Sequence, residues 1–310
     1  MVKPASKSIN YLKLIAALLF WGGLYHVAKP AAEAADPFIV AFLRYLIASI
    51  LLLIVLRIKT GKLKPNLNLR QWLLIISIGT IGICFYNIFF MSAEALISGN
   101  IVAILYAFAP CLTTVISSYL FKTHLNWLCK LGIVLALLGS IGVVNFATPG
   151  CEKLFCTTIF SNINRGEIYG ILATVVFACY SVLSKCASHQ NISGLVINTY
   201  AAVVGCILLG VISLFTSNYS EVTALGSSFW LALLYMSVLA TVVAYLWYID
   251  ALINLGVFKT VVFQNTLPLQ TVLIGYIFFH EKVTFGELAC GGIVLVGVYL
   301  TNYALTMQKD

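Results

Sequence analysis

The chain has 310 residues, of which 61% are apolar and 9% are charged, and its mean hydropathy is +1.01. Soluble domains carry about 25% charged residues, so this composition excludes a water-soluble globular protein. The formal net charge is +8, but the basic residues lie between apolar runs rather than in one patch, which argues against a nucleic-acid partner. At roughly 20 residues per membrane span, the chain has room for about ten transmembrane helices.

Apolar runs along the chain predict an all-α, polytopic membrane protein. Such runs must be helical, because lipid offers no hydrogen-bond partner to a free backbone group and no alternating barrel pattern is present. The first run follows Lys3 and Lys7 but is too long for a signal peptide and lacks a clear cleavage site. The ten predicted helices are 11–30, 38–58, 71–91, 98–121 and 126–146, followed after a polar loop by 167–187, 193–215, 228–250, 257–280 and 286–306.

The distribution of charge predicts the orientation of these helices in the cell (inner) membrane. With the amino terminus in the cytoplasm, most basic residues fall on the inside, as the positive-inside rule requires. Both termini are then cytoplasmic, and the polar loop 148–165 faces outward. The predicted inside residues are Lys3, Lys7, Lys13, Arg57, Lys59, Lys62, Lys64, Arg70, Lys122, Lys130, Lys185 and Lys309.

The two halves of the chain are similar to each other. Ala93 and Pro110 correspond to Ala251 and Pro268 at an offset of 158 residues, and each pair frames a loop that leads into a helix expected to have the proline near its centre. We expect one five-helix repeat in 1–147 and a second in 166–310. Five is an odd number of spans, so the repeats have inverted topology, which is a transporter architecture.

Nine cysteines are scattered along the chain without metal-ligand spacing, and most lie in or beside apolar runs. Only Cys151 and Cys156 share a polar loop. This pair is a disulfide candidate if the loop faces an oxidising compartment. We expect neither a metal nor a cofactor.

Three segments resemble the EamA-type transporters of the drug/metabolite transporter superfamily: AALLFWGGLYHVAKPA, MSAEALISGNIVAILYAFAPCLTTVISSYLF and the long segment from YLWYIDALINLGVF to GGIVLVGVYL. The most recognisable unit places Phe279 and Glu281 after Pro268, with Gly291 and Gly292 on the last helix. The resemblance implies ten helices, movement of a metabolite such as an amino acid, and coupling to protons or to a solute gradient.

One departure from the family pattern concerns Lys122. Aligning the halves on Gly132 and Gly291 places Lys122 opposite Glu281, where the first half of the family carries an acid. This reversed charge is expected either to alter gating or to be a simple cytoplasmic anchor.

Charged and aromatic residues inside the first two helices are the first site candidates. Trp21 and Tyr25 are four residues apart on one helical face, and His26 is adjacent. His26 is a candidate for proton coupling because its side chain titrates near neutral pH, with hydrogen-bonded packing as the alternative. Arg44, inside the second helix, needs a partner; we expect either a salt bridge to Glu33, Asp36 or outer headgroups, or a role in substrate binding or coupling.

The ninth predicted helix contributes the main polar cluster. Gln264 and Asn265 precede Pro268, so two amides and uncapped carbonyls meet near mid-membrane. The other expected lining residues are aromatic or polar and lie on several helices: Asn87, Tyr106, Tyr180, Tyr245 and Tyr248. Such a lining suits a neutral or zwitterionic solute better than a metal ion or a polyphosphate.

These features favour a secondary transporter that works by alternating access on amino acids or related amine compounds. A carrier of nucleoside- or nucleotide-derived metabolites is the alternative substrate class, because aromatic rings stack on either. A membrane sensor or channel is the alternative of another class. An enzyme is not expected, since paired intramembrane carboxylates or an activated nucleophile are missing. The expected partners are a small-molecule substrate, the bilayer and, for the coupled case, protons; the chain is expected to be a monomer or homodimer.

Overall fold

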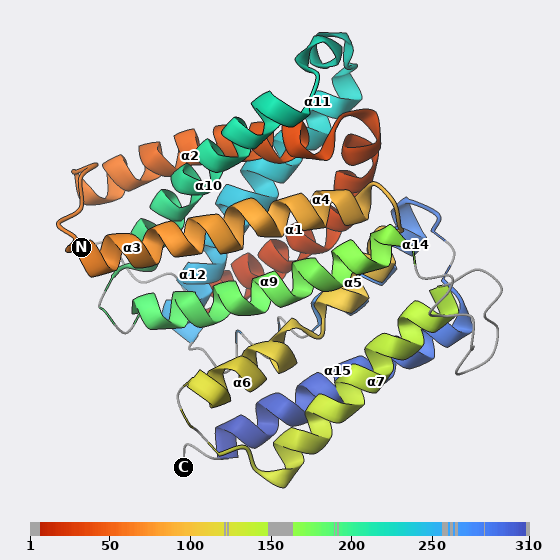
Figure 1. The fold of residues 1–310 in the computed structure, drawn as a ribbon. Coiled ribbons are helices and arrows are strands. Elements are labelled where there is room, and N and C mark those ends of the chain that lie inside the picture. The colour runs from red at the N-terminus through yellow and green to blue at the C-terminus, as the bar shows by residue number, and fades with distance from the viewer. Residues whose placement is uncertain are drawn as a thin grey trace.

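The computed structural model describes residues 7–120, 122, 124–147, 164–188, 190, 192–255, 260, 263, 266–281 and 283–307. Over these residues the secondary structure is helical, with short connecting segments (Figure 1). The first half contains α1 (Lys7–Ala34), α2 (Pro37–Thr60), α3 (Leu69–Ile78), the π-helix η1 (Gly79–Phe85), α4 (Tyr86–Glu94), α5 (Gly99–Tyr106), α6 (Ala109–Leu120) and α7 (Trp127–Ala147).

The described elements of the second half follow a similar order. It contains α9 (Arg165–Ser188), α10 (Gly194–Thr216), the short 3₁₀ helix η2 (Tyr219–Ala224), α11 (Ser227–Leu234), the π-helix η3 (Tyr235–Val243), α12 (Ala244–Leu255), α14 (Leu267–Phe278) and α15 (Phe285–Met307). In both halves a π-helix joins two α-helices into one continuous rod.

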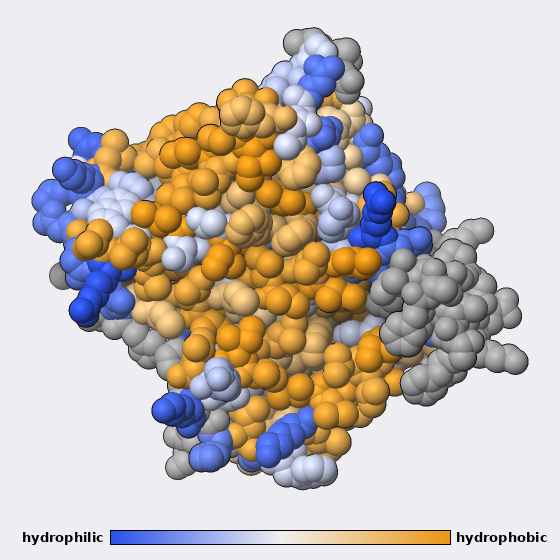
Figure 2. All heavy atoms as spheres, in the orientation of Figure 1, coloured by the Kyte–Doolittle hydropathy of each residue, from blue (hydrophilic) through white to orange (hydrophobic). Residues whose placement is uncertain are grey.

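The helices are long and apolar enough for a membrane-spanning protein. Within the described residues, eight helical stretches meet the length and hydropathy of a span, and two shorter apolar helices, Trp127–Val143 and Leu269–Phe278, lie in the predicted fifth and ninth spans. Figure 2 shows an apolar surface over the middle of the helices, with hydrophilic residues gathered at both of their ends. The chain is therefore a multi-pass integral membrane protein with an all-α fold.

Equivalent helices of the two halves begin at a constant spacing, which defines an internal repeat. The starts of four equivalent pairs are 158 residues apart: Leu69 and Ser227, Tyr86 and Ala244, Ala109 and Leu267, and Trp127 and Phe285. The π-helices obey the same relation, since η1 ends at Phe85 and η3 at Val243. The internal repeat thus includes the π-helix, which is a local irregularity of the backbone.

The two symmetric prolines begin helices rather than lying at the centre of one. Pro110 and Pro268 are each the second residue of their helix, α6 and α14. A proline has no N–H group and its ring clashes with the preceding turn, so it is tolerated in the first turn of a helix but not in its interior. The span expected at 98–121 is accordingly interrupted between Tyr106 and Ala109.

The expected alignment of Lys122 with Glu281 is wrong by one residue. The helices on either side keep the 158-residue spacing, which pairs Lys122 with His280 instead. Both residues have a left-handed backbone, with φ of 51° and 53°, and they are the non-glycine residues with positive φ in the described structure. Glu281 therefore corresponds in sequence to Thr123. Lys122 does not reverse the charge at the acidic position.

The helices form two packed groups. α7 and α15 lie side by side along the lower edge of Figure 1. Their contact is close because glycines face each other: a Cβ on Gly297 would lie 2.4 Å from the Ala136 nitrogen and 2.6 Å from the Gly132 oxygen. In the other group, α1 packs against α12, α14, η3 and α5, and thus contacts elements from both repeats.

Candidate substrate-binding site

The candidate site is arranged around α1, whose side chains reach both repeats. The Trp21 indole N–H donates to the Ala240 carbonyl of η3 at 2.8 Å, and its ring centroid lies 5.1 Å from that of Tyr248 on α12. One turn further along α1, Tyr25 is buried against Phe90 and Tyr106, with centroids 5.6 and 6.3 Å away. The predicted shared face of Trp21 and Tyr25 thus lies between η3, α12, α4 and α5.

A continuous aromatic cluster extends from Tyr25 across the first repeat to α9. Tyr86 stacks on Phe90, and Tyr106 packs 4.6 Å from Phe177, which in turn lies 5.3 Å from Tyr180. The structure therefore brings together the predicted residues Tyr25, Tyr106 and Tyr180. We call this set the aromatic wall: Tyr25, Tyr86, Phe90, Tyr106, Phe177 and Tyr180.

Arg44 lies beside this wall, in the interior of the protein. Its side chain is almost fully buried, and its guanidinium donates to the Thr241 hydroxyl at 3.0 and 3.1 Å and to the Asn87 side-chain oxygen at 3.2 Å. The expected salt bridge to Glu33, Asp36 or headgroups is wrong, because Arg44 points inward. Glu33 pairs with Lys29 instead, and Asp36 caps α2 by accepting from the Phe38 N–H.

His26 belongs to a polar network centred on Glu281, in the segment between α14 and α15. Its Nδ1 lies 2.8 Å from Glu281 Oε1, and its Nε2 lies 2.8 Å from the Thr271 carbonyl oxygen. Ser98 and Asn100, at the start of α5, donate to Glu281 Oε2 at 2.9 and 2.7 Å. We call these four side chains, His26, Ser98, Asn100 and Glu281, the Glu281 network; it joins three separate segments at one end of the protein.

The hydrogen-bond pattern assigns the proton positions in this network. A carbonyl oxygen only accepts, so Nε2 of His26 carries a proton toward Thr271. Burial of Glu281 raises its pKa, but hydrogen bonding and charge from His26, with the bond from Ser98, outweigh burial and hold the pKa below its usual value. Glu281 is therefore a carboxylate, and its contact with Nδ1 of His26 is a charge-assisted hydrogen bond.

An ion pair joins α1 to the second repeat near the other end of the helix. Lys13 Nζ lies 2.7 Å from Asp250 Oδ2 on α12. Beside it, Tyr11 packs against Phe263, and Leu14 and Leu18 are fully buried. Lys13 and His26 are 13 residues apart on α1, which corresponds to roughly 20 Å of helix. The Trp21 contacts lie between these two ionic contacts.

The remaining sequence candidates are distributed as follows. The Tyr245 hydroxyl donates to the Gly194 carbonyl at 3.3 Å, and Tyr248 packs on Trp21. Gln264, Asn265, Cys151 and Cys156 lie outside the described residues, so the amide cluster and the disulfide stay predictions.

Several residues of the site had no signal that could single them out in the sequence. Thr241 and Phe177 lie inside apolar runs like many others, and Glu281 was noted only as a family marker. Glu94 is fully buried at the end of α4, and neither carboxyl oxygen has a hydrogen-bond partner in the described structure. Helix-to-helix contacts decide these positions, and local sequence does not encode them.

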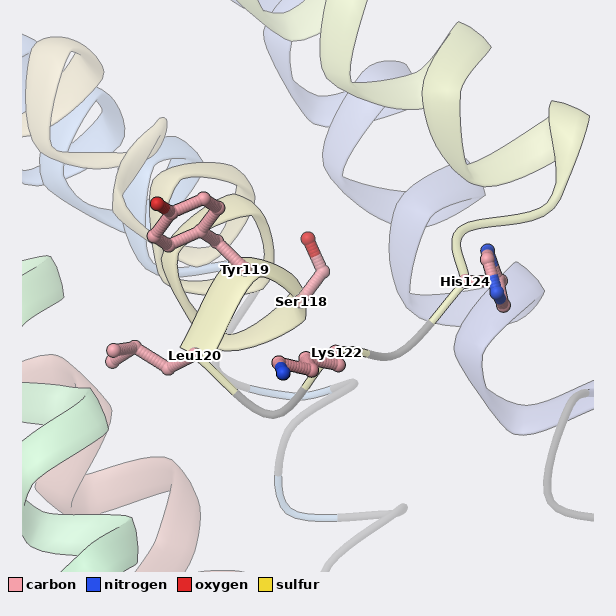
Figure 3. A pocket seen from close by; sticks show the side chains of 5 residues that line it. All are labelled: Ser118, Tyr119, Leu120, Lys122 and His124. Carbon is pink, nitrogen blue, oxygen red and sulfur yellow. The ribbon is translucent and has the colours of Figure 1, made fainter.

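A separate hollow of about 580 Å³ lies on the surface at the end of α6. Figure 3 shows its lining side chains pointing in different directions, with His124 across from the α6 residues. Tyr119 is 85% exposed. This hollow is distinct from the buried site beside α1. It is lined by Ser118, Tyr119, Leu120, Lys122 and His124.

Together, the membrane-spanning helices, the internal repeat and the buried aromatic and polar site define a polytopic membrane protein of the transporter type. The model of the EamA-like transporter family matches residues 8–145 and 164–303, once in each half. The chain belongs to this family.

Relatives of similar length support this assignment. The chain is 26% identical over 307 residues to the Bacillus subtilis transporter YyaM, covering 96% of this chain and 98% of YyaM. It is 29% identical over 314 residues to a transporter from Archaeoglobus fulgidus, covering 95% and 98%. A solved crystal structure with 19% identity matches with a TM-score of 0.65 over 98% of this chain and all of that one, which shows the shared fold.

Proposed function

We propose that this protein is a secondary transporter that carries a small organic metabolite across the cell (inner) membrane by alternating access, with amino acids or related amine compounds as substrates. The termini are cytoplasmic in this proposal, as the distribution of basic residues indicates. Two inverted repeats that exchange conformations around one central site give inward-open and outward-open states.

The observation that carries the proposal is the arrangement along α1. The Lys13–Asp250 ion pair lies near one end, the Glu281 network lies at the other, and the Trp21 and Tyr25 contacts lie between them. Each ionic contact joins α1 to an element of the second repeat. Opening one contact while the other stays closed would expose the central site to one side of the membrane at a time.

The side chains that surround the site beside α1 indicate the class of substrate. The tyrosines of the aromatic wall supply hydroxyl groups and stacking surfaces to a small neutral or zwitterionic solute. The same rings favour a nucleobase as the second candidate, because bases stack on aromatic side chains.

The test is uptake of labelled amino acids and nucleosides into liposomes that contain the purified protein, with and without a pH gradient. Saturable uptake of amino acids is the expected result. Saturable uptake of nucleosides alone would make nucleosides, rather than amino acids, the substrate class. No uptake above that of protein-free liposomes for any compound would contradict the proposal.

Proton coupling is part of the proposal, with His26 as the candidate residue. Opening the Glu281 network separates His26 from the Glu281 carboxylate and so changes the charge beside its imidazole ring. His26→Gln should flatten the dependence of flux on pH, while the wild-type protein shows a clear dependence. An unchanged pH profile in His26→Gln would remove this residue from the coupling mechanism.

A further inference from the structure

Arg44 is a buried cation whose hydrogen-bond partners are neutral. It is 4% exposed, and the bonds from its Nε, Nη1 and Nη2 atoms end on Thr241 and Asn87. An arginine side chain is always charged in a protein. Among the described residues, no carboxylate lies within ion-pair distance of it.

The carboxylates on neighbouring elements form no ion pair with Arg44 in the described structure. Asp36 accepts from the Ser217 hydroxyl as well as from Phe38, and Glu33 pairs with Lys29. Glu94 is the fully buried acid on α4, and no ion pair joins it to Arg44 in the described structure. The positive charge of Arg44 is thus not neutralised by the part of the chain that the structure describes.

A buried charge without a counterion is costly, since desolvation is repaid only by a well-placed opposite charge. Insertion scales give about 2.5–3.5 kcal/mol for an arginine at the centre of a membrane helix. Intramembrane charges therefore mark substrate or ion sites by default. The guanidinium fork is suited to a carboxylate, which it binds through two parallel hydrogen bonds.

The groups that hold Arg44 come from the two symmetric π-helices. Thr241 lies within η3, and its hydroxyl donates to the Met236 carbonyl five residues earlier, at 2.7 Å. Asn87 follows η1 by two residues, and its amide donates to the Ile83 carbonyl inside η1 at 2.7 Å. Each partner therefore has its acceptor oxygen fixed toward Arg44. π-Helical turns occur frequently at functional sites.

We propose that Arg44, oriented by Asn87 and Thr241, binds the carboxylate of the transported solute, whose apolar or aromatic body then packs on the aromatic wall. This inference rests on the proposed transport function and narrows its substrates to organic carboxylates, amino acids included. Neutral nucleosides and amines that lack a carboxylate are excluded. Asn87 and Thr241 are positioning residues in this scheme.

The first test uses the wild-type protein and a matched set of solutes. Liposomes preloaded with unlabelled solute take up labelled L-phenylalanine, L-leucine, phenylpyruvate or uridine, and each transported carboxylate is then compared with its primary amide as competitor. The amide keeps the size and one acceptor oxygen, but it loses the charge and replaces the second acceptor oxygen by a donor NH2 group. We expect amides to compete about 10- to 100-fold more weakly, as the loss of hydrogen bonds to a charged group predicts.

The second test asks whether Arg44 is the source of this preference. Arg44→Gln should reduce the ratio of carboxylate to amide affinity to near one, and Arg44→Lys should retain part of it. Thr241→Val is nearly isosteric and removes the oxygen that accepts two Arg44 bonds, so the ratio should fall by several-fold. Arg57→Gln is the matched control, because Arg57 is an exposed arginine on the same helix and bonds only the Gly61 carbonyl among described groups.

The outcomes separate this inference from the proposed function. Transport of uridine or of amides as efficiently as carboxylates by the wild-type protein would overturn the carboxylate site while leaving the carrier intact. A full carboxylate preference in Arg44→Gln would also overturn it. No saturable uptake of any solute would contradict the carrier and this site together.

Discussion

At the scale of single residues, the site is built from side chains whose neighbours lie far away in the sequence. The four-residue spacing predicted that Trp21 and Tyr25 share a face of the first helix, because helical geometry is local. The Thr241 partner of Arg44 lies 197 residues away, and no local pattern indicates it. The sequence therefore indicated that Arg44 needs a partner, but it pointed to the wrong acceptors.

Trp21 provides a test of the central aromatic contacts. Trp21→Ala removes both the hydrogen bond to Ala240 and the packing against Tyr248, so uptake should fall at least about tenfold while expression stays intact. Trp21→Phe keeps a ring and should give an intermediate rate. Trp127→Ala is the control, because Trp127 is 75% exposed. Wild-type uptake by Trp21→Ala would remove this residue from the site.

Glu281 gives the pH dependence of the network it centres. The pKa of Glu281 is lowered in the folded protein. The carboxylate therefore stabilises the folded protein fully above the usual carboxyl pKa, and this stabilisation is lost as pH falls through the lowered pKa. Glu281→Gln should remove this dependence and speed hydrogen exchange in segments 98–106 and 275–281 at neutral pH. Exchange rates identical to the wild-type protein would show that Glu281 does not hold these segments together.

At the scale of elements, hydropathy predicts the ends of several membrane-spanning helices closely. It does not predict the breaks and π-helical turns inside them. The predicted helix 38–58 is observed as Pro37–Thr60, and 286–306 as Phe285–Met307, because the change from apolar to polar residues marks the membrane boundary. The break before Pro110 and the two π-helices were not predicted. A π-helical turn depends on a shift of one backbone hydrogen bond, which neighbouring helices select and composition does not reveal.

The contact between α7 and α15 is predicted to depend on individual glycines. Gly297→Ala places a Cβ 2.4 Å from the Ala136 backbone nitrogen. Overpacking should therefore lower the free energy of unfolding by about 1–3 kcal/mol. Gly292→Ala lies on the same helix with open space around it and should be neutral or stabilising by about 0.5–1 kcal/mol. Thermal unfolding in detergent measures both. Equal melting temperatures for the two variants would contradict this packing.

At the scale of the whole molecule, the internal repeat could be predicted from the sequence. The contacts that Lys13 and His26 make near the two ends of α1 could not. The 158-residue offset between the two proline positions is the offset that the equivalent helices show. The equal spacing of four helix pairs means that the segments between them have matching lengths in the two halves. The Lys13–Asp250 ion pair and the His26–Glu281 contact break this symmetry, since they join α1 to α12 and to the segment that contains Glu281.

The Lys13–Asp250 ion pair should bias the equilibrium between conformations more than it stabilises the fold. Partly exposed pairs contribute about 0.2–1 kcal/mol, so Lys13→Asp should change the melting temperature little but reduce uptake through charge repulsion with Asp250. The exchanged variant Lys13→Asp with Asp250→Lys should restore uptake. If the exchanged variant is as slow as the single variant, the ion pair itself is not what matters.

The central claim, a carrier that alternates access around α1, is tested most directly by exchange across a liposome membrane. Labelled amino acid is added outside liposomes that contain the purified protein and are preloaded with the same unlabelled compound or left empty. The account predicts saturable uptake that preloading accelerates, because a loaded carrier reorients with substrate on both sides. Uptake that neither saturates nor responds to preloading would contradict the carrier and point to a channel or a sensor.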